Sequence, residues 1–215
     1  MDLHTFRRDA LLFNPTDFGR IFAFVDFSNV RYWAKSFWPE ANRERLTREI
    51  DIEKLAQMID MVGTVEKFFY YGHYKPRPNL PPEHSQNLPY RNSIFRIDKA
   101  RKAGFTVRTK DIKTIDTYDE TGRRQGQIHK CNFDVEITMD MVKQLPKYDT
   151  VFLWSGDSDF GPLLAYLKSK GKRVVTVCAR AFASSELKEI SAPFIPADRL
   201  RDQLELLPHK KALPA

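Results

Sequence analysis

The chain has 215 residues, of which 42% are apolar and 16 are phenylalanine, so it is long enough to bury a sizeable core. Its 35 Lys and Arg residues outnumber 28 Asp and Glu residues, and the resulting charge of +7 is weak support for a polyanionic partner. No apolar run approaches the roughly 18 residues of a membrane span, and two cysteines with scattered histidines exclude a disulfide framework or a zinc site. Because Arg7, Arg8 and Asp9 interrupt the segment where a signal peptide would be apolar, we expect a cytoplasmic protein.

The first half of the chain predicts strands that alternate with a helix or a loop. The apolar run of residues 20–29 stops at Asp26 and is typical of a buried strand. Residues 51–63 place apolar side chains at helical spacing and end at Gly63, so an amphipathic helix is expected there. The next expected elements are a strand over 64–74, a proline-rich loop over 75–89, a helix from 90 that Gly104 ends, and a strand over 104–112.

A charged segment over residues 105–130 separates the two halves. Its cations include Arg123, Arg124 and Lys130, and an acidic helix follows immediately. Such a segment suits a phosphate backbone held near metal ions, and it is equally typical of a solvated hairpin with mixed charges. The elements expected after it are a helix over 133–146, a strand over 148–156, a helix over 159–171, a strand over 172–179, a short helix over 184–191, a last helix over 197–206 and a frayed end over 208–215.

The alternation of apolar strands with helices predicts the fold class. Strands that read as continuous apolar runs are buried on both faces, so we expect a three-layer α/β sandwich around a central parallel sheet. No internal repeat or inner domain boundary is visible. We therefore expect an N-terminal extension over residues 1–19, one domain over 20–200 and a C-terminal tail over 201–215.

Two carboxylates follow predicted strands that are far apart in the sequence. Asp26 ends the first strand and Asp157 follows the fourth. Ligands of an open parallel sheet bind outside the carboxyl ends of the strands, where the strand order reverses. If these two strands are neighbours at that point, both side chains meet in one crevice.

Further polar residues lie at strand or helix ends, and each has an alternative role. Asp134 begins a helix and points toward Asp26 or caps the helix. Asp159 faces the same edge or caps the next helix. Asn29 binds a phosphate or a metal-bound water, or stabilises a turn. Ser155 presents its hydroxyl to the crevice, or is a small residue tolerated at a strand end.

The helix after the charged segment also contains Glu136 and Asp140. On a helical wheel these two residues lie opposite the expected apolar face, and Asp140 lies roughly 9 Å along the axis from Asp134. We therefore expect Asp140 to be a surface residue or one that acts through another ligand. The buried stripe expected on this helix is Val135, Thr138, Met141, Val142 and Leu145.

A cluster of carboxylates without a cationic partner predicts a metal site. The charges repel, and a divalent cation relieves the repulsion. Ligands that are all oxygen suit Mg²⁺ or Mn²⁺. Beside a basic segment, such an ion supports phosphodiester hydrolysis, because it activates a water and stabilises the departing oxygen.

Three segments resemble the signature blocks of a known family. They are "FAFVDFSNVRYW", "KCNFDVEITMDMV" and "FLWSGDSDFGPLLAYLKSKGKRVVTV", within residues 20–180. These blocks are similar to the NYN domain, the LabA-like branch of the PIN-domain superfamily. The resemblance implies a PIN-like sheet with strand order 3-2-1-4-5, in which the first and fourth strands are neighbours. It also implies a metal-dependent ribonuclease whose acidic roles fall on Asp26, Asp134, Asp157 and Asp159, with a polar role for Asn29.

Our leading hypothesis is a Mg²⁺- or Mn²⁺-dependent endoribonuclease. Asp26 and Asp157 hold the catalytic metal, and Asp134 binds a second metal or its water. Asp159 orients waters, and Asn29 contacts the scissile phosphate or a metal-bound water. The residues expected to contact RNA are Lys130, Arg123, Arg124 and Ser155, and the aromatic residues that either stack on bases or pack in the core are Tyr32, Trp33 and Tyr74.

Two other functions remain open at this point. The first alternative is a non-catalytic RNA- or protein-binding module that keeps the acidic pocket but does not cleave RNA. A homo-oligomer is also compatible with the sequence. A phosphatase of the haloacid dehalogenase type is disfavoured, because the stretch Asp26–Phe27–Ser28 lacks the second acid that such a nucleophile motif requires.

Overall fold

A computed structural model describes residues 14–38 and 49–206 of the chain. No helix in these two ranges is both long and apolar enough to cross a membrane. Part of the expected N-terminal extension, part of the expected tail and the whole of the expected frayed end lie outside the described residues.

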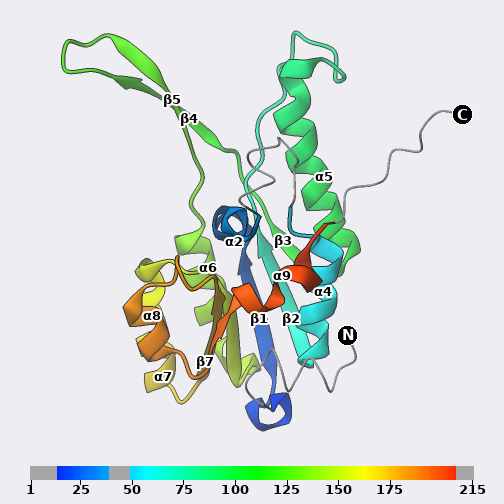
Figure 1. The fold of residues 1–215 in the computed structure, drawn as a ribbon, viewed down its shortest axis with the longest axis vertical. Helices are drawn as coiled ribbons and strands as arrows, with labels where there is room; N and C mark the ends of the chain where they lie inside the picture. Colours follow the sequence, from blue (N-terminus) through cyan, green and yellow to red (C-terminus); the bar gives the residue numbers. More distant parts are fainter. Residues whose placement is uncertain (1–13, 39–48, 207–215) are drawn as a thin grey trace, which may run out of the picture.

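Within the described residues, the centre of the molecule is a six-stranded parallel sheet in the order β3-β2-β1-β6-β7-β8 (Figure 1). Its strands are β1 (Ile21–Asp26), β2 (Thr64–Tyr70), β3 (Thr106–Arg108), β6 (Thr150–Trp154), β7 (Arg173–Cys178) and β8 (Phe194–Pro196). The predicted α/β, PIN-like class is confirmed. The predicted five-strand order recurs as β3-β2-β1-β6-β7, and the short edge strand β8 was not predicted.

Helices cover both faces of the sheet, as the apolar strands require. In β1, Ile21, Ala23 and Val25 face one core, and Phe22 and Phe24 face the other. The first core packs against α2, α4, α5 and α9, and the second against α6, α7 and α8. The helices are α2 (Phe27–Ala34), α4 (Ile52–Met61), α5 (Leu88–Lys102), α6 (Asp134–Lys143), α7 (Gly161–Ser169), α8 (Ser185–Ile190) and α9 (Arg201–Leu204). The 3₁₀ helices are η2 (Pro15–Phe18), η3 (Lys35–Phe37), η4 (Ser85–Asn87), η5 (Leu145–Lys147), η6 (Ser158–Phe160) and η7 (Ala197–Leu200).

Helix α2 was not predicted from the sequence, and it begins directly where β1 ends. Asp26 is its N-cap residue, and the Asp26 carboxylate accepts a hydrogen bond of 3.1 Å from the Asn29 backbone N–H. Val30, Trp33 and Ala34 are buried at helical spacing. The capping acid and this spacing were the sequence signals from which α2 could have been predicted. They were missed because no loop residue separates the helix from the preceding strand.

The charged segment forms a hairpin that stands apart from the main sheet. Strands β4 (Lys113–Tyr118) and β5 (Arg124–Lys130) pair only with each other, in antiparallel register. The hairpin extends from the same end of the molecule as the N-terminal part of α5 (Figure 1). The solvated hairpin with mixed charges that the sequence left open is therefore present.

Helix α6 is turned about its axis relative to the prediction. Its buried residues are Ile137, Asp140 and Met141, whereas Val135 is 73% exposed. The predicted stripe was therefore wrong at Val135 and Val142, which is also exposed. The expectation that Asp140 lies on the solvated face was wrong for the same reason.

Asp140 is buried because two strands supply it with partners. Its carboxylate accepts hydrogen bonds from the Tyr70 hydroxyl at 2.9 Å and from Arg108 Nε at 2.8 Å. Arg108 Nη2 reaches the second carboxylate oxygen at 3.3 Å. A buried charge paired in this way fixes the orientation of the helix against the sheet. The Arg108–Asp140 pair thus joins α6, which starts at Asp134, to β2 and β3.

We predict that Arg108→Met destabilises the fold by about 2 kcal/mol, because Asp140 then stays buried with only the Tyr70 hydroxyl as partner. Urea denaturation monitored by circular dichroism measures this change. The matched control is Arg101→Met, which removes an exposed ion pair to Asp98 at 2.9 Å and is expected to cost less than about 0.5 kcal/mol. Adding Asp140→Asn to Arg108→Met removes the unpaired charge and should recover at least half of the loss. Equal stability of the two single variants contradicts this role.

Candidate metal centre

The carboxyl ends of β1 and β6 lie side by side, as the crevice hypothesis required. Val25 of β1 is paired with Trp154 of β6 in parallel register. In the strand order, β2 is the neighbour of β1 on one side, and β6 is its neighbour on the other side. This is the reversal of strand order at which open parallel sheets bind ligands. Asp26 and the loop that begins at Ser155 therefore share one edge.

The loop after β6 is shaped by its own polar groups. The Asp157 side chain caps η6 and accepts a hydrogen bond of 3.1 Å from the Asp159 backbone N–H. The Ser155 hydroxyl accepts one of 3.3 Å from the Asp157 backbone N–H. Ser155 is completely buried, which leaves no room for the RNA contact predicted for it. Its role in the structure is to hold the turn that presents Asp157.

Asn29 joins the two loops at this edge. Its side-chain oxygen accepts a hydrogen bond of 3.0 Å from the Gly156 backbone N–H. A Cβ atom at position 156 would collide with Cys178 Sγ and with the Phe182 carbonyl oxygen, so glycine is required for this close approach. The Asn29 side chain thus ties the start of α2 to the loop that contains Asp157.

Asp134 is the first residue of α6 and is held by a neighbour that the sequence analysis missed. The Asn132 side chain accepts a hydrogen bond of 2.7 Å from the Asp134 backbone N–H and donates one of 2.5 Å to Asp134 Oδ2. The N-cap position belongs to Phe133, so the capping alternative for Asp134 does not apply. An Asn two residues before a helical acid was the available signal.

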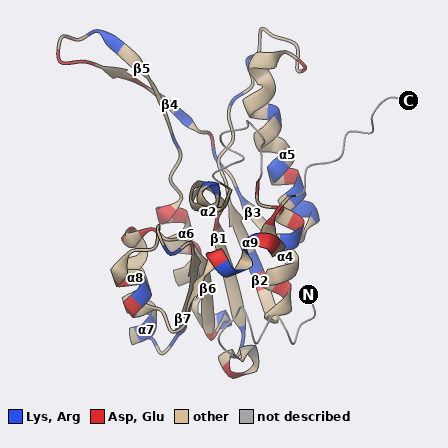
Figure 2. Cartoon of the chain, viewed as in Figure 1, with Lys and Arg blue, Asp and Glu red and all other residues tan. Residues whose placement is uncertain are grey.

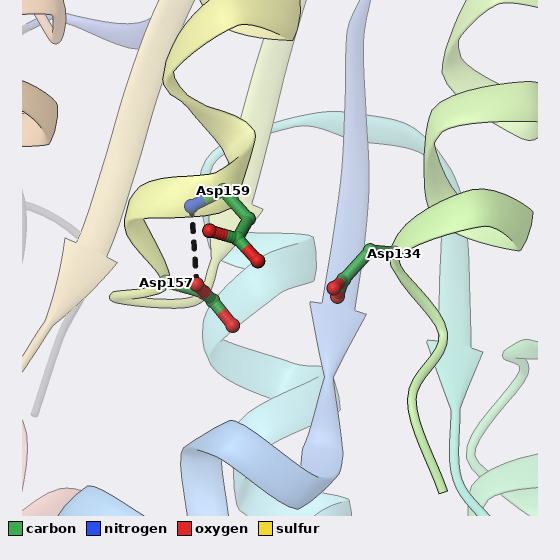
Figure 3. A group of neighbouring side chains, drawn as sticks. All are labelled: Asp134, Asp157 and Asp159. Atoms are coloured by element: carbon green, nitrogen blue, oxygen red, sulfur yellow. Dashed lines mark hydrogen bonds between the residues drawn. The ribbon is translucent and has the colours of Figure 1, made fainter.

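Three carboxylates form a compact cluster at this edge. Asp134, Asp157 and Asp159 each offer one oxygen atom, and these atoms all lie within 4.8 Å of one another. Asp134 faces the other two across the end of β1 (Figure 3). In the described part of the chain, none of the three carboxylates forms an ion pair with Lys or Arg. The cluster is thus a set of oxygen ligands without a cation of its own.

Asp26, the last residue of β1, is buried and close enough to Asp134 and Asp157 for their charges to act on it. The side chain is only 7% exposed, and burial raises the pKa of the Asp26 carboxyl to about 6, with further increases from the charges of Asp134 and Asp157. Burial and the charges of Asp157 and Asp159 also raise the pKa of Asp134. Four acidic groups therefore repel one another at a single edge of the sheet.

This donor set fits a hard divalent cation. Carboxylate oxygens without a protein cation lose their mutual repulsion when such an ion binds. The predicted ligand set was Asp26, Asp134 and Asp157, whereas the compact set is Asp134, Asp157 and Asp159. The compact set therefore contains Asp159, which was not among the predicted ligands, and does not contain Asp26.

The cations expected to contact RNA are spread along the hairpin. Lys130 lies at its base and is exposed, four residues before Asp134. Arg124 begins β5 at the distal turn and pairs with Asp116 at 2.8 Å, and Arg123 precedes it there. Lys130 therefore lies at the end of the hairpin that leads into α6, whereas Arg123 and Arg124 lie at the distal turn. Figure 2 shows that Lys and Arg residues occur along this hairpin.

Comparisons with known proteins agree with this arrangement. A family model of the NYN domain matches residues 20–200. The low amplitude and bright protein LabA of Synechococcus elongatus is 33% identical over 103 residues, which are 47% of this chain and 53% of that protein. The chain thus spans about half the length of this relative. A crystal structure of a protein of unknown function from Vibrio parahaemolyticus shares the fold, with a TM-score of 0.57 and 23% identity over 87% of this chain and 96% of that one.

We predict that Asp26→Asn stabilises the metal-free protein at pH 8 by roughly 3 kcal/mol, and by less than about 1 kcal/mol at pH 4. The raised pKa means that the folded chain binds this proton more tightly than the unfolded chain. The contribution of Asp26 to stability is therefore complete below about pH 4 and is lost as the pH rises through 6. Asparagine also keeps the N-cap.

Urea denaturation in EDTA at both pH values tests this prediction. The matched control is Asp202→Asn, which changes a side chain that is 87% exposed and should have no effect that differs between pH 8 and pH 4. A destabilised Asp26→Asn variant at pH 8 would show that the carboxylate is better accommodated than its burial indicates.

Proposed function

The chain belongs to the NYN domain family, and on this premise we propose that it is a Mg²⁺- or Mn²⁺-dependent endoribonuclease. Members of this family are typically metal-dependent nucleases, and an acidic triad is present here. The observation that carries the proposal is the convergence of Asp134, Asp157 and Asp159, none of which forms an ion pair with Lys or Arg among the described residues. A structural cluster of this kind would be expected to contain an arginine or a lysine, as Asp140 does with Arg108.

Asp134, Asp157 and Asp159 would hold the ion, and the buried carboxylate of Asp26 would add to the negative field of the site. An ion bound there would supply an activated water and would stabilise the departing oxygen of the phosphodiester. Asn29 keeps Asp157 in place through Gly156, and Asn132 keeps Asp134 in place. These two amides therefore set the spacing of the carboxylates before any ligand binds.

Lys130 is the cation best placed to hold the RNA backbone beside the cluster. It lies at the base of the hairpin, is exposed, and forms no ion pair with any residue that the structure describes. Arg123 and Arg124 lie farther along the hairpin and would contact the backbone at a distance from the scissile bond. A salt-dependent affinity for RNA follows from contacts of this type.

One observation favours the alternative of a non-catalytic binding module. Val135, Met139 and Val142 form an exposed apolar stripe on α6, at i, i+4 and i+7, and such a stripe suits a protein partner or a second copy of the chain. The family assignment replaces the haloacid dehalogenase alternative, which already lacked its second acid after Asp26. Turnover decides between the nuclease and the binding module.

We predict that Mn²⁺ at 100 times its Kd raises the Tm by roughly 5–10 °C, since binding of that strength adds about 2.7 kcal/mol to the stability of a chain of this size. The variants Asp134→Asn, Asp157→Asn and Asp159→Asn should each lose most of this shift. Differential scanning fluorimetry measures it, and Asp202→Asn is the surface control. An equal Mn²⁺ shift in all four variants contradicts the assignment of the ligands.

We predict that Asp157→Asn and Asp134→Asn each reduce the rate of RNA cleavage at least about 100-fold, since the loss of a group that merely supports a ligand already costs roughly 10- to 100-fold. A labelled RNA incubated in Mg²⁺ or Mn²⁺, with EDTA as the blank, gives the rate. Wild-type cleavage in both variants, in protein cleared of contaminating nuclease, would overturn the proposed function. RNA binding without cleavage by the wild type would favour the binding module.

A further inference from the structure

We propose that the groove between the hairpin β4–β5 and the start of α5 binds a single-stranded RNA segment and leads it to the carboxylate cluster. This inference rests on the proposed function and adds the path of the substrate. The hairpin and the N-terminal part of α5 extend from the same end of the molecule (Figure 1). A groove of about 990 Å³ is lined by residues of both, together with the chain that follows β2.

The floor of the groove is a fixed part of the structure. The chain that leaves β2 is joined to the base of the hairpin by hydrogen bonds from His73 N to the Lys110 carbonyl oxygen at 3.0 Å and from Ile112 N to the His73 carbonyl oxygen at 2.8 Å. Tyr74 N donates to Ser93 Oγ of α5 at 3.4 Å. Both walls of the groove are therefore attached to the same stretch of backbone.

Aromatic rings line the groove at intervals. Tyr74, Tyr90 and His129 contribute to its wall, and each of the two tyrosines is partly exposed. The Tyr74 and His129 rings meet edge to face, with centroids 5.3 Å apart. A neighbouring hollow of about 250 Å³ shares Tyr74 and His129 and adds Tyr32, which is 61% exposed. Aromatic side chains in a groove of this kind are the platforms on which unpaired bases stack.

The groove is strongly cationic. Its lining contains the cations Lys75, Arg77, Lys110 and Lys113 and only one acid, Asp111. Lys75 pairs with Asp111 at 3.1 Å, and Lys110 pairs with Glu136 at 2.6 Å. Arg77 and Lys113 form no ion pair with any residue in the described ranges. These two side chains remain available for an anionic partner.

The hairpin itself contains an unfavourable pair that a polyanion would relieve. Lys113 of β4 is directly opposite Lys130 of β5, and like charges at such positions destabilise a two-stranded ribbon. Both side chains are exposed, and neither has a carboxylate partner in the part of the chain that the structure describes. A phosphate backbone that passes this pair interacts favourably with both lysines.

The groove and the carboxylate cluster are connected. Lys110 lines the groove, and its Nζ pairs at 2.6 Å with Glu136, which is two residues from Asp134 on α6. The smaller hollow extends from Tyr74 and His129 to Ser28, which is two residues from Asp26. A strand that occupies both hollows therefore ends beside the acidic groups.

The lining favours a single strand over a duplex. Bases in a duplex are stacked on one another and present no free face to Tyr74, Tyr90 or Tyr32, whereas an unpaired strand offers both its bases and its phosphates. The lining contains both aromatic rings and cations, and contacts to both are available only to an unpaired strand. We therefore commit to single-stranded RNA as the occupant.

Binding in EDTA tests the groove without cleavage. The probe is a fluorescein-labelled 16-nucleotide oligouridylate, and anisotropy gives its Kd for the full chain. We expect Tyr74→Leu and Tyr90→Leu each to raise the Kd about 5-fold or more, since a stacked base contributes at least this much. Arg77→Gln and Lys113→Gln should also raise the Kd and should reduce the slope of log K against log salt by roughly 0.7 for each phosphate that is no longer neutralised.

The matched controls are Tyr166→Leu and Lys170→Gln on α7. These two residues form an exposed aromatic–cation pair, with Lys170 Nζ 5.3 Å from the ring centroid, at the opposite end of the molecule from the hairpin (Figure 1). Neither control should change the Kd by more than about twofold, because neither touches the groove. Circular dichroism confirms that every variant is folded.

The outcomes separate this proposal from the proposed function. Weaker binding in the groove variants and wild-type binding in the controls support the groove, even if the protein cleaves no RNA. A metal-dependent nuclease whose groove variants bind and cleave as the wild type does would overturn the groove and leave the nuclease intact. Equal affinity of the wild type for a 16-base-pair duplex, or no binding of the oligouridylate at all, would also overturn it.

Discussion

The mutual repulsion of four acidic groups at one edge of the sheet is the constraint on which the rest of the site depends. Asp26 ends β1, Asp134 begins α6 and Asp157 lies in the loop after β6, so the fold itself brings them together. None of the carboxylates of Asp134, Asp157 and Asp159 forms an ion pair with Lys or Arg among the described residues. Hydrogen bonds from neutral amides position them instead: Asn29 through Gly156, and Asn132 directly. A site built in this way has oxygen ligands of the kind that a hard divalent ion prefers.

The three acidic side chains of α6 differ in their hydrogen-bond and ion-pair partners and therefore in their roles. Asp140 has Arg108 and Tyr70 as partners and is therefore neutralised and structural. Glu136 is paired with Lys110. Asp134, at the start of the same helix, has only the Asn132 amide. The paired acids fix the helix against β2 and β3, and the unpaired acid can then be presented at a defined position.

The hairpin adds to this core a surface with different physical properties. The sheet and its helices bury apolar side chains on both faces, whereas β4 and β5 bury almost nothing and present lysine, arginine and tyrosine to solvent. A two-stranded ribbon of this kind has little stability of its own. Its base is joined to the chain after β2 by backbone hydrogen bonds, so its position relative to the central sheet is fixed there. The core holds the cluster of carboxylates, and the hairpin adds exposed polar surface that contains lysine and arginine.

The sequence by itself determined the fold class and the identity of the acids. Continuous apolar runs such as residues 21–25 specify strands that are buried on both faces, and an acid directly after such a run must lie at the end of the sheet. The resemblance of three segments to the NYN domain supplied the strand order. Local patterns of this kind extend over a few residues and can be read directly.

Only the tertiary structure decided which groups face one another. The helical wheel of α6 placed Asp140 in solvent, because the wheel considers only the apolar residues of the helix itself. The two partners of Asp140, Arg108 and Tyr70, lie on strands that are distant in the sequence. The same limit applies to Asn29 and Gly156, which are 127 positions apart and meet through one hydrogen bond. Contacts between residues so far apart in the chain are set by how the layers pack, and packing depends on all the elements at once.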